Sequence, residues 1–238
     1  MDHRFAVIAD VHGNRWALEA VLEDIARRGV RDIVNAGDHL WGPLDPEGTA
    51  DLLIRLALPS VSGNQDRELL RDSSLSETNR AWLASLPLQL KLDNNTLMFH
   101  GTPTRDNIYL LETVHADGSV TLASNEEITE RLGDVSESLV LCGHTHIPRI
   151  IELPNRTSNR TIVNPGSVGL QAYFDDQPVH HLMETGSPRA RYAIVERRET
   201  DWHIELTAID YDFESAARTA ERNGRPDWVF RLTTGRVP

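Results

Sequence analysis

Short apolar runs and segments of helical periodicity alternate in the first half of the chain. The apolar run at residues 4–9 is typical of a buried strand. Apolar residues then recur at helical spacing between Asn14, a good N-cap, and Gly29, a residue type common just past a helix end. This order of strand and helix favours a parallel sheet. The pattern continues with a strand at 32–36, a helix at 46–58 and a short strand at 60–62.

The pattern changes after Asp66, where strand signals dominate. A helix is expected at 78–86, and an Asp93-Asn94-Asn95 turn between the apolar runs 88–92 and 96–99 predicts a hairpin. No repeat, linker or low-complexity stretch divides the chain, so we expect one layered α/β domain, residues 1–238, with mixed sheets. Further strands are predicted at 139–142, 149–153, 160–163, 192–197 and 202–209, and closing helices at 214–223 and 227–232.

Composition narrows the class of protein. The 238 residues are 39% hydrophobic and 25% charged, which is typical of a soluble globular protein. No apolar run approaches the roughly 20 residues that a membrane span needs. The apolar run at 5–9 is too short and too early for a secretory leader, so we expect a cytoplasmic protein. The single cysteine, Cys142, lies in an apolar run and is expected to be a buried core residue.

Net charge limits the partners that the chain can bind. The 24 basic and 36 acidic residues give a formal net charge of −12, which repels polyanions and argues against a broad nucleic-acid surface. A small anionic substrate would therefore need a local source of positive charge.

Five polar clusters follow directly after predicted strands, where open α/β sheets gather their ligand-binding loops. Any one cluster could be ordinary cap or turn chemistry. Together they offer two carboxylates, an amide oxygen and four imidazoles, a set that suits manganese, iron, zinc or cobalt at a two-metal site. The clusters are Asp10-Val11-His12-Gly13-Asn14, Gly37-Asp38-His39, Gly63-Asn64-Gln65-Asp66, His100-Gly101 and Gly143-His144-Thr145-His146.

His144 and His146 stand two residues apart, a spacing that sends side chains to opposite faces of a regular strand. Either a loop led by Gly143 aims both histidines at one site, or each histidine reaches a different metal. Four further histidines outside the clusters are expected to be ordinary surface or core residues; they are His115, His180, His181 and His203.

The order of the clusters resembles the motif series of the calcineurin-like metallophosphoesterases, D-x-H, G-D, G-N-H-D, H and G-H-x-H. Four of the five motifs match letter for letter. Residues 163–169 also resemble the N-P-G-S-V-G stretch of the compact bacterial and archaeal phosphodiesterase branch, and Tyr211-Asp212 with the closing 232–235 resembles the tail of that branch. The resemblance implies an α/β fold, a four-layer α/β/β/α sandwich of two mixed β-sheets flanked by helices, with a dinuclear metal centre at one edge.

The resemblance also implies which residues bind metal, and all seven positions carry the expected residue type. Asn14 and Asp66 would orient these ligands, or would serve only as cap and turn residues. The implied set places Asp10, His12 and His146 on one metal, Asn64, His100 and His144 on the other, and Asp38 between both.

Two divalent metal ions are the implied cofactors, with manganese first and iron, zinc, nickel or cobalt as alternatives. Two ions, two carboxylates and a bridging hydroxide sum to about +1, so the centre would attract phosphate although the chain is acidic. The ions would lower the pKa of the bridging water, and the hydroxide would attack phosphorus in line.

The third motif departs from the family pattern at Gln65, where many members carry a histidine thought to protonate the leaving group. A glutamine amide donates a hydrogen bond to a phosphoryl oxygen but delivers no proton. We therefore expect either leaving groups that need little protonation, such as aryl phosphates and phosphoanhydrides, or help from His39 beside Asp38. Trp41 is expected either in the wall of a substrate pocket or in the core.

The sequence thus predicts a metal-dependent phosphoesterase, first of all a phosphodiesterase, that acts on a small phosphorylated substrate. The alternative is a non-catalytic, metal-binding interaction scaffold on the same fold, against which the intact ligand set argues. A serine hydrolase is excluded because Gly166-Ser167-Val168-Gly169 lacks the G-x-S-x-G spacing. Selectivity is expected from the loops at 103–121 and 171–189, which carry no recognisable code. No membrane partner is expected, and the oligomeric state is left open.

Overall fold

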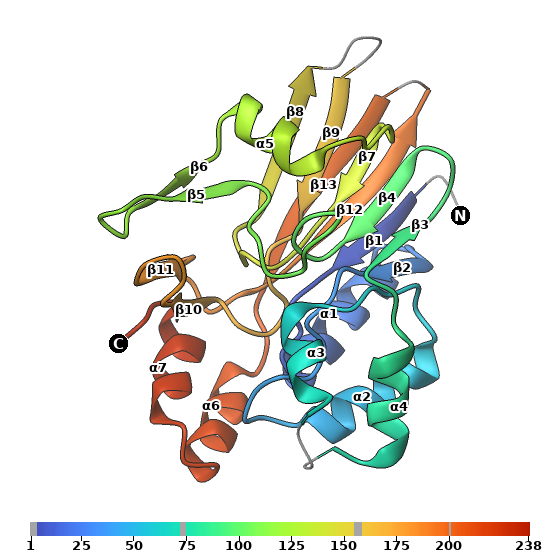
Figure 1. Ribbon diagram of the computed structural model, residues 1–238. Helices are drawn as coiled ribbons and strands as arrows, with labels where there is room; N and C mark the ends of the chain where they lie inside the picture. The colour runs from blue at the N-terminus through green and yellow to red at the C-terminus, as the bar shows by residue number, and fades with distance from the viewer. Residues whose placement is uncertain (1–3, 72–74, 155–158, 200) are drawn as a thin grey trace.

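Two β-sheets packed face to face form the centre of the computed structural model, which describes residues 4–71, 75–154, 159–199 and 201–238 (Figure 1). The first sheet has the strand order β13–β12–β1–β2, and the second has the order β3–β4–β7–β9–β8. Two hairpins, β5–β6 and β10–β11, form separate two-stranded sheets. The strands are β1 (Arg4–Ile8), β2 (Asp32–Asn35), β3 (Gln89–Lys91), β4 (Thr96–Phe99), β5 (Glu112–Val114), β6 (Val120–Leu122), β7 (Leu139–Leu141), β8 (Arg149–Pro154), β9 (Asn159–Asn164), β10 (Ala172–Asp175), β11 (His181–Glu184), β12 (Ala190–Arg198) and β13 (Asp201–Ile209).

Both large sheets are mixed. β1 pairs in parallel with β2, with Val7 opposite Val34, and antiparallel with β12. β7 pairs in parallel with both β4 and β9. Because side chains alternate along a strand, Phe5 and Val7 pack in the core between the sheets, whereas Ala6 and Ile8 pack against helices. A strand covered on both faces is apolar throughout, which explains the continuous apolar run at the start of the chain.

Helices cover the outer face of each sheet. Leu18 of α1 and Trp228 of α7 pack on the first sheet, and Ile128 and Leu132 of α5 pack on the second. In the described part of the chain, none of the helices has both the length and the apolar character to cross a membrane. The helices are α1 (Arg15–Arg27), α2 (Pro46–Leu56), α3 (Asn64–Leu69), α4 (Glu77–Ser85), α5 (Asn125–Leu132), α6 (Phe213–Arg222) and α7 (Pro226–Thr234).

This arrangement confirms the expected α/β/β/α sandwich of two mixed sheets flanked by helices. The predicted hairpin is present as β3–β4, and Asn14 caps α1 by accepting a hydrogen bond from the backbone N–H of Ala17. The other predicted strands and helices are found within a few residues of their expected bounds, with two exceptions at the end of α2 and just after it.

The first exception is the end of α2, which stops at Leu56, two residues before the predicted end. Ala57 takes the left-handed conformation with φ 50°, and this terminates the helix. The second exception is the predicted strand at 60–62, which is wrong as a regular strand. Only Ser60 forms a bridge, in parallel with Asn35, so the parallel part of the first sheet has two strands rather than three.

Several short elements were not predicted. They are the helices α3 and α5 and the hairpins β5–β6 and β10–β11. α3 is six polar-rich residues without apolar periodicity, and the hairpin strands are three or four residues long. α5 did carry a signal, because Ser124 and Glu127 form a capping box at its start. Both hairpins lie in the segments expected to carry selectivity.

Candidate metal centre

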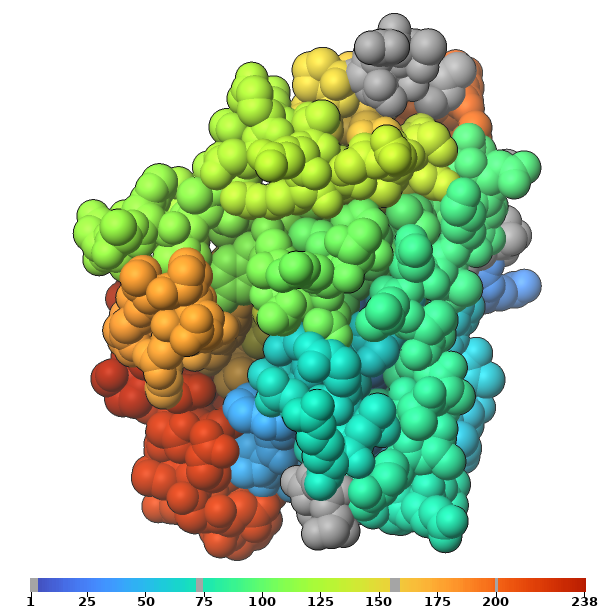
Figure 2. Space-filling view, in the orientation of Figure 1, coloured from blue at the N-terminus to red at the C-terminus, as the bar shows by residue number. Residues whose placement is uncertain are grey.

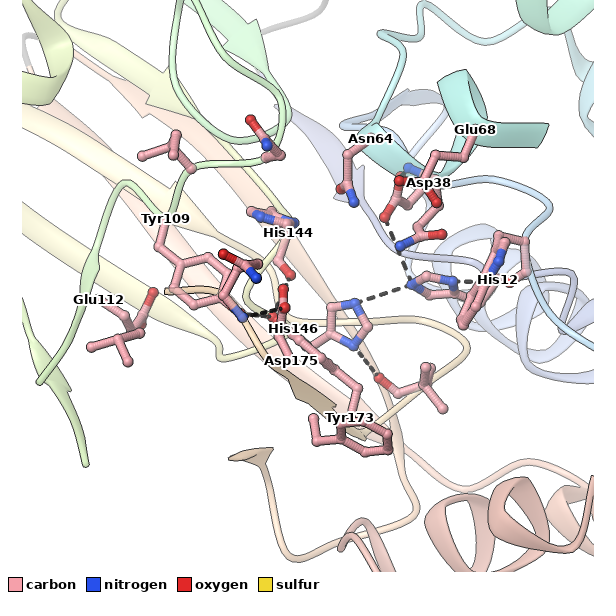
Figure 3. A pocket seen from close by; sticks show the side chains of 18 of the residues that line it. His12, Asp38, Asn64, Glu68, Tyr109, Glu112, His144, His146, Tyr173 and Asp175 are labelled. Atoms are coloured by element: carbon pink, nitrogen blue, oxygen red, sulfur yellow. Dashed lines mark hydrogen bonds and ion pairs between the residues drawn. The ribbon is translucent and has the colours of Figure 1, made fainter. Parts of the chain in front are cut away.

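The five polar clusters converge at the strand ends, as expected from their positions in the sequence. Backbone hydrogen bonds tie the loops together: the N–H of Asp10 donates to Gly37 O at 2.9 Å, and that of Gly143 donates to His100 O at 2.8 Å. The loop after β1 is also joined to the loop after β2 through His12 N and Asp38 O at 3.1 Å. Figure 3 shows His12, Asp38, Asn64, His144 and His146 around one space.

Six of the seven predicted metal ligands form two buried groups, Asp10, His12 and His146 in one and Asp38, His100 and His144 in the other. Within each group the candidate ligand atoms lie within 4.8 Å of one another. In the first group His146 Nε2 is 3.3 Å from Asp10 Oδ1, and in the second His100 Nε2 is 3.3 Å from Asp38 Oδ2. Asp38 Oδ2 is also 4.0 Å from His12 Nε2, so this oxygen lies between the two groups.

The backbone of these residues is strained. Asp10, His12, Asp38, His144 and His146 all have positive φ, between 52° and 72°. The left-handed conformation is unfavourable for residues with a Cβ, by about 1–2 kcal/mol each, and such strain gathers at functional sites. The loop at 143–146, here called the histidine loop, is therefore not a regular strand. His144 and His146 belong to different groups of candidate ligands, which is the second of the two arrangements expected from the sequence.

Backbone carbonyls orient three of the imidazoles. The Nδ1–H of His12 donates to Trp41 O at 3.0 Å, that of His100 to Ala36 O at 2.8 Å, and that of His146 to Leu170 O at 2.6 Å. A carbonyl only accepts, so each neutral ring carries its proton on Nδ1 and points the lone pair of Nε2 into the centre. This is the tautomer that a metal ligand needs.

Two of these lone pairs face each other. His12 Nε2 and His146 Nε2 are 3.1 Å apart, and both rings are buried. Because both Nδ1 atoms donate to carbonyls, the two Nε2 atoms attract each other only when a proton or another cation lies between them. Burial and then the charge of His146 lower the pKa of His12, so a proton between the two Nε2 atoms is disfavoured. A metal cation resolves the same contact.

Other buried candidate ligand atoms are also left without a hydrogen bond within the described residues. Asp10 Oδ1, Asn64 Oδ1 and His100 Nε2 make no aligned hydrogen bond within the described residues. An unsatisfied buried polar atom costs about 1–3 kcal/mol. A mixed set of carboxylate, amide and imidazole donors suits first-row divalent cations, so the residues present fit a pair of such ions.

The carboxylates and imidazoles of the centre shift one another's pKa values strongly. Burial raises the pKa of the Asp38 carboxyl, but the neighbouring imidazoles, His100 foremost, hold it well below its usual range. Burial lowers the pKa of His100, but the charges and hydrogen bonds of its neighbours, Asp38 foremost and then Asp10, together outweigh burial and raise it to about 10. For His144, burial and then the charge of His100 lower the pKa to about 4. The carboxylates are therefore ionised, and a cation that binds His100 Nε2 has to displace a proton from that atom.

Asp66 fixes the loop that carries Asp38. Its carboxylate accepts hydrogen bonds from the backbone N–H of Asp38, His39 and Gly63 at 2.8–3.0 Å. The N–H of Gln65 donates to Asp38 Oδ1 at 2.9 Å, which leaves Oδ2 for the centre. Gly63 has no room for a side chain, because an added Cβ would lie 2.1 Å from Asp38 Oδ1.

Asn14 has the expected cap role, and its side chain also joins two loops. Its amide oxygen caps α1, and its NH₂ group donates to Gly169 O at 2.9 Å and to the Tyr211 hydroxyl at 3.1 Å. The side chain thereby joins the loop after β1 to the segment at 163–169 that the sequence analysis singled out.

Gln65 and His39, the two residues considered for help to the leaving group, lie in different surroundings. Gln65 lines the pocket over the centre beside Asp38. His39 is fully buried, its Nδ1 is 2.7 Å from Asp66 Oδ2, and its ring packs edge-on against Trp82 at 5.1 Å. His39 thus contacts Asp66 and Trp82 and is not among the described residues that line the pocket.

Two tyrosines that sequence reasoning missed hold the histidine loop. The Tyr173 hydroxyl donates to His144 O at 3.0 Å, and its ring lies 4.6 Å from the His146 ring. The Tyr109 ring lies 4.9 Å from the His144 ring, and the two tyrosine hydroxyls are 2.8 Å apart. His181, expected to be an ordinary residue, is buried and contacts the Tyr109 hydroxyl at 2.9 Å. No sequence pattern marked these contacts.

A pocket of about 930 Å³ opens over the centre, at the surface hollow beside the orange β10–β11 hairpin in Figure 2. Both segments expected to carry selectivity contribute to its walls, through Tyr109 and Glu112 and through Tyr173 and Phe174. Trp41 also lines it, with its ring 5.8 Å from that of His12, so this residue belongs to the pocket wall.

Comparisons with known proteins agree on one family. Residues 4–187 match the calcineurin-like phosphoesterase superfamily domain. An uncharacterized protein of Methanocaldococcus jannaschii is 30% identical over 256 residues, which cover 97% of this chain and 98% of the relative. The crystal structure of a metallophosphoesterase from Sphaerobacter thermophilus matches with a TM-score of 0.76 and 27% identity, covering 99% of this chain and 100% of the other.

Proposed function

The chain belongs to the calcineurin-like phosphoesterase superfamily and is a phosphoric ester hydrolase, and from this premise we propose that it is a phosphodiesterase with a dinuclear metal centre. Its substrate in this proposal is a small phosphorylated compound that fits a pocket of about 930 Å³.

The proposed ligand set has three residues for each ion and one shared carboxylate. The shared residue is Asp38, because its Oδ2 atom lies between the two groups. Manganese is the first choice of metal, with iron, zinc, nickel or cobalt as alternatives, because the donors suit several first-row ions. The set assigns Asp10, His12 and His146 to one ion and Asn64, His100 and His144 to the other.

The facing imidazoles of His12 and His146 carry the proposal. Two lone pairs held 3.1 Å apart by backbone carbonyls make sense around a cation and are unfavourable without one. The arrangement therefore supports a metal centre, and an assay of phosphate ester hydrolysis separates the enzyme from a metal-binding interaction scaffold.

When bound, divalent ions supply Lewis acidity for phosphoryl transfer. The chain contributes orientation: Asp66 fixes the Asp38 loop, and Tyr173 fixes the His144 carbonyl. The Gln65 side chain lines the pocket and can donate a hydrogen bond to a phosphoryl oxygen, but it has no proton to give to a leaving group. The proposal therefore includes a preference for aryl esters or phosphoanhydrides over alkyl esters.

The test is hydrolysis of bis(p-nitrophenyl) phosphate with added Mn²⁺, together with elemental analysis of the purified protein. Asp38→Asn should lower kcat/KM by about 10³-fold, since several kcal/mol of charge stabilisation depend on the ions. The matched control is Asp51→Asn, the same change at an exposed position on α2, which should leave kcat/KM unchanged. Metal-loaded protein that hydrolyses no phosphate ester would favour the interaction scaffold.

A further inference from the structure

The pocket extends from the candidate metal centre to helix α7, where two arginines line it. They are Arg225, the residue before the helix, and Arg231, two turns further along. Both share a single carboxylate: the Nε and Nη2 atoms of Arg225 donate to Asp227 at 2.9 and 2.8 Å, and Arg231 Nη2 is 3.2 Å from Asp227 Oδ2. Two cations against one anion leave this end of the pocket with excess positive charge.

These guanidinium groups are not fully used by the protein. Within the described residues, the Nη1 atoms of both arginines have no hydrogen-bond partner, and Nε of Arg231 is buried without one. The Arg231 side chain is only 6% exposed and its guanidinium lies 5.2 Å from the Phe174 ring centre. Arginine presents its donors in a rigid fork that matches phosphate. Arg225 precedes the first turn of α7, where the positive end of the helix dipole also favours an anion, whereas Arg231 lies in the last turn.

The two ends of the pocket are joined by aromatic side chains. The guanidinium of Arg225 is 5.7 Å from the Trp228 ring, which is 6.4 Å from the His12 ring. The distance from the Arg225 guanidinium to the His12 ring is therefore at most the sum of these two distances. Trp41 packs against both rings and forms the pocket wall between them. A base or sugar fits between two anionic groups at such a separation.

Acidic residues elsewhere in the pocket limit the places where an anion is attracted. Glu68 and Asp175 line the wall, and Glu112 is paired with Arg149 at 3.1 Å. An anion is therefore favoured at the metal centre and at α7 and disfavoured beside the carboxylates of Glu68 and Asp175.

We propose that Arg225 and Arg231 form a second anion-binding site, and that the substrate is a nucleotide-like phosphodiester that carries a further phosphate away from the reacting one. The inference rests on the proposed function, since it assigns the reacting phosphodiester to the metal centre. It deepens that function by setting a substrate class.

The test compares two substrates that differ only in a remote phosphate. One is the p-nitrophenyl diester of thymidine 5′-monophosphate, and the other is the same diester with a 3′-phosphate. Both release p-nitrophenol, so chemistry at the reacting group is matched. With the Mn²⁺-loaded parent protein, the 3′-phosphorylated compound should have about tenfold higher kcat/KM, as expected for charge-assisted hydrogen bonds.

Variants of the two arginines test whether these side chains cause the difference in kcat/KM between the two diesters. Arg225→Gln should bring the ratio of the two kcat/KM values to about one, and its side chain is exposed enough for the fold to tolerate the change. Arg231→Gln should do the same, although its burial makes Arg225→Gln the decisive variant. Arg222→Gln on α6, whose side chain bonds Thr219, is the matched control and should keep the ratio of the parent.

A ratio near one in the parent, or a tenfold ratio that survives Arg225→Gln, would overturn the second anion site. If neither diester is hydrolysed, the proposed function fails instead. The site is then judged by calorimetry of the Mn²⁺-loaded protein with thymidine 3′,5′-bisphosphate and thymidine 5′-monophosphate. Tighter binding of the bisphosphate that Arg225→Gln abolishes supports the site, and equal binding overturns it.

Discussion

At the scale of single residues, Tyr173 links the β10–β11 hairpin to the candidate metal centre. Its hydroxyl holds the carbonyl of His144, a residue with φ 72°, and its ring contacts His146. Tyr173→Phe keeps the ring and removes the hydrogen bond. We expect about tenfold weaker Mn²⁺ activation, in the range found for groups that orient metal ligands. The measurement is activity against Mn²⁺ concentration.

Tyr192→Phe is the matched control for that experiment. The Tyr192 hydroxyl donates to Asp24 of α1, outside the candidate centre. Its loss should lower the free energy of unfolding by about 1 kcal/mol and leave the Mn²⁺ dependence unchanged. If Tyr173→Phe behaves in the same way, Tyr173 serves stability alone.

Gln65 gives a second prediction at this scale. Gln65→His places a proton donor on the pocket wall, where the motif of the family usually has one. General acid catalysis contributes about 10²–10⁴-fold, and it matters most for poor leaving groups. We expect alkyl phosphodiesters to be hydrolysed at least about tenfold faster and bis(p-nitrophenyl) phosphate at an almost unchanged rate. An alkyl rate no higher than that of the parent would contradict the idea that the missing proton limits the enzyme.

Most residues that could be predicted from sequence lie in loops that follow a strand, and Asn64 is an exception because residues 60–62 form no regular strand. Strand ends meet at one edge of a sheet, so Asp10 and Asp38 could be placed together without a structure. Tyr109 and Tyr173 act through hydroxyls and ring faces from irregular segments, and no periodicity marks such contacts. The burial of His181 was missed for the same reason.

At the scale of secondary structure, prediction succeeded where residue chemistry sets a boundary. Asn14 starts α1, and the Asp93-Asn94-Asn95 turn joins β3 to β4. Prediction failed where tertiary contacts rather than local residue chemistry determine the secondary structure, as in the three-residue strands of β5–β6. The end of α2 belongs to this second group, because alanine has no preference for the left-handed conformation that Ala57 takes.

Ala57 gives a prediction at this scale. Ala57→Gly should raise the free energy of unfolding by about 0.5–1 kcal/mol, because glycine adopts φ 50° without the Cβ penalty. The opposite change after α1, Gly29→Ala, should lower it by about 1 kcal/mol, since φ is +70° there and no atom lies within 4 Å of the added Cβ. Urea denaturation of both variants measures the two shifts. Shifts of the same sign would show that backbone conformation does not govern these helix ends.

At the scale of the whole molecule, two sheets bring loops from distant parts of the sequence to one edge, and the architecture was predictable from the alternation of strands and helices. The sandwich follows because β1 and β7 are apolar on both faces and must be covered twice. A single domain over residues 1–238 and a cytoplasmic location stay predictions of the sequence. The formal charge of −12 also acts at this scale, since phosphate then depends on local positive charge, which our proposals place at the metal centre and at the arginines of α7.

Metal binding should stabilise the entire fold, because the proposed ligands come from loops of both sheets. An ion that binds the folded chain alone adds RT ln(1 + [L]/Kd), about 2.7 kcal/mol at one hundred times Kd. For a chain of this size, 1 kcal/mol corresponds to about 2–4 °C in Tm. We therefore expect Mn²⁺ to raise Tm by about 5–10 °C over protein treated with EDTA. Asp38→Asn should reduce this shift, whereas Asp51→Asn should keep it. An equal Mn²⁺ shift in the parent and in Asp38→Asn would mean that the ion binds elsewhere, and the loops at the sheet edge would then be held together by backbone and side-chain hydrogen bonds without a metal.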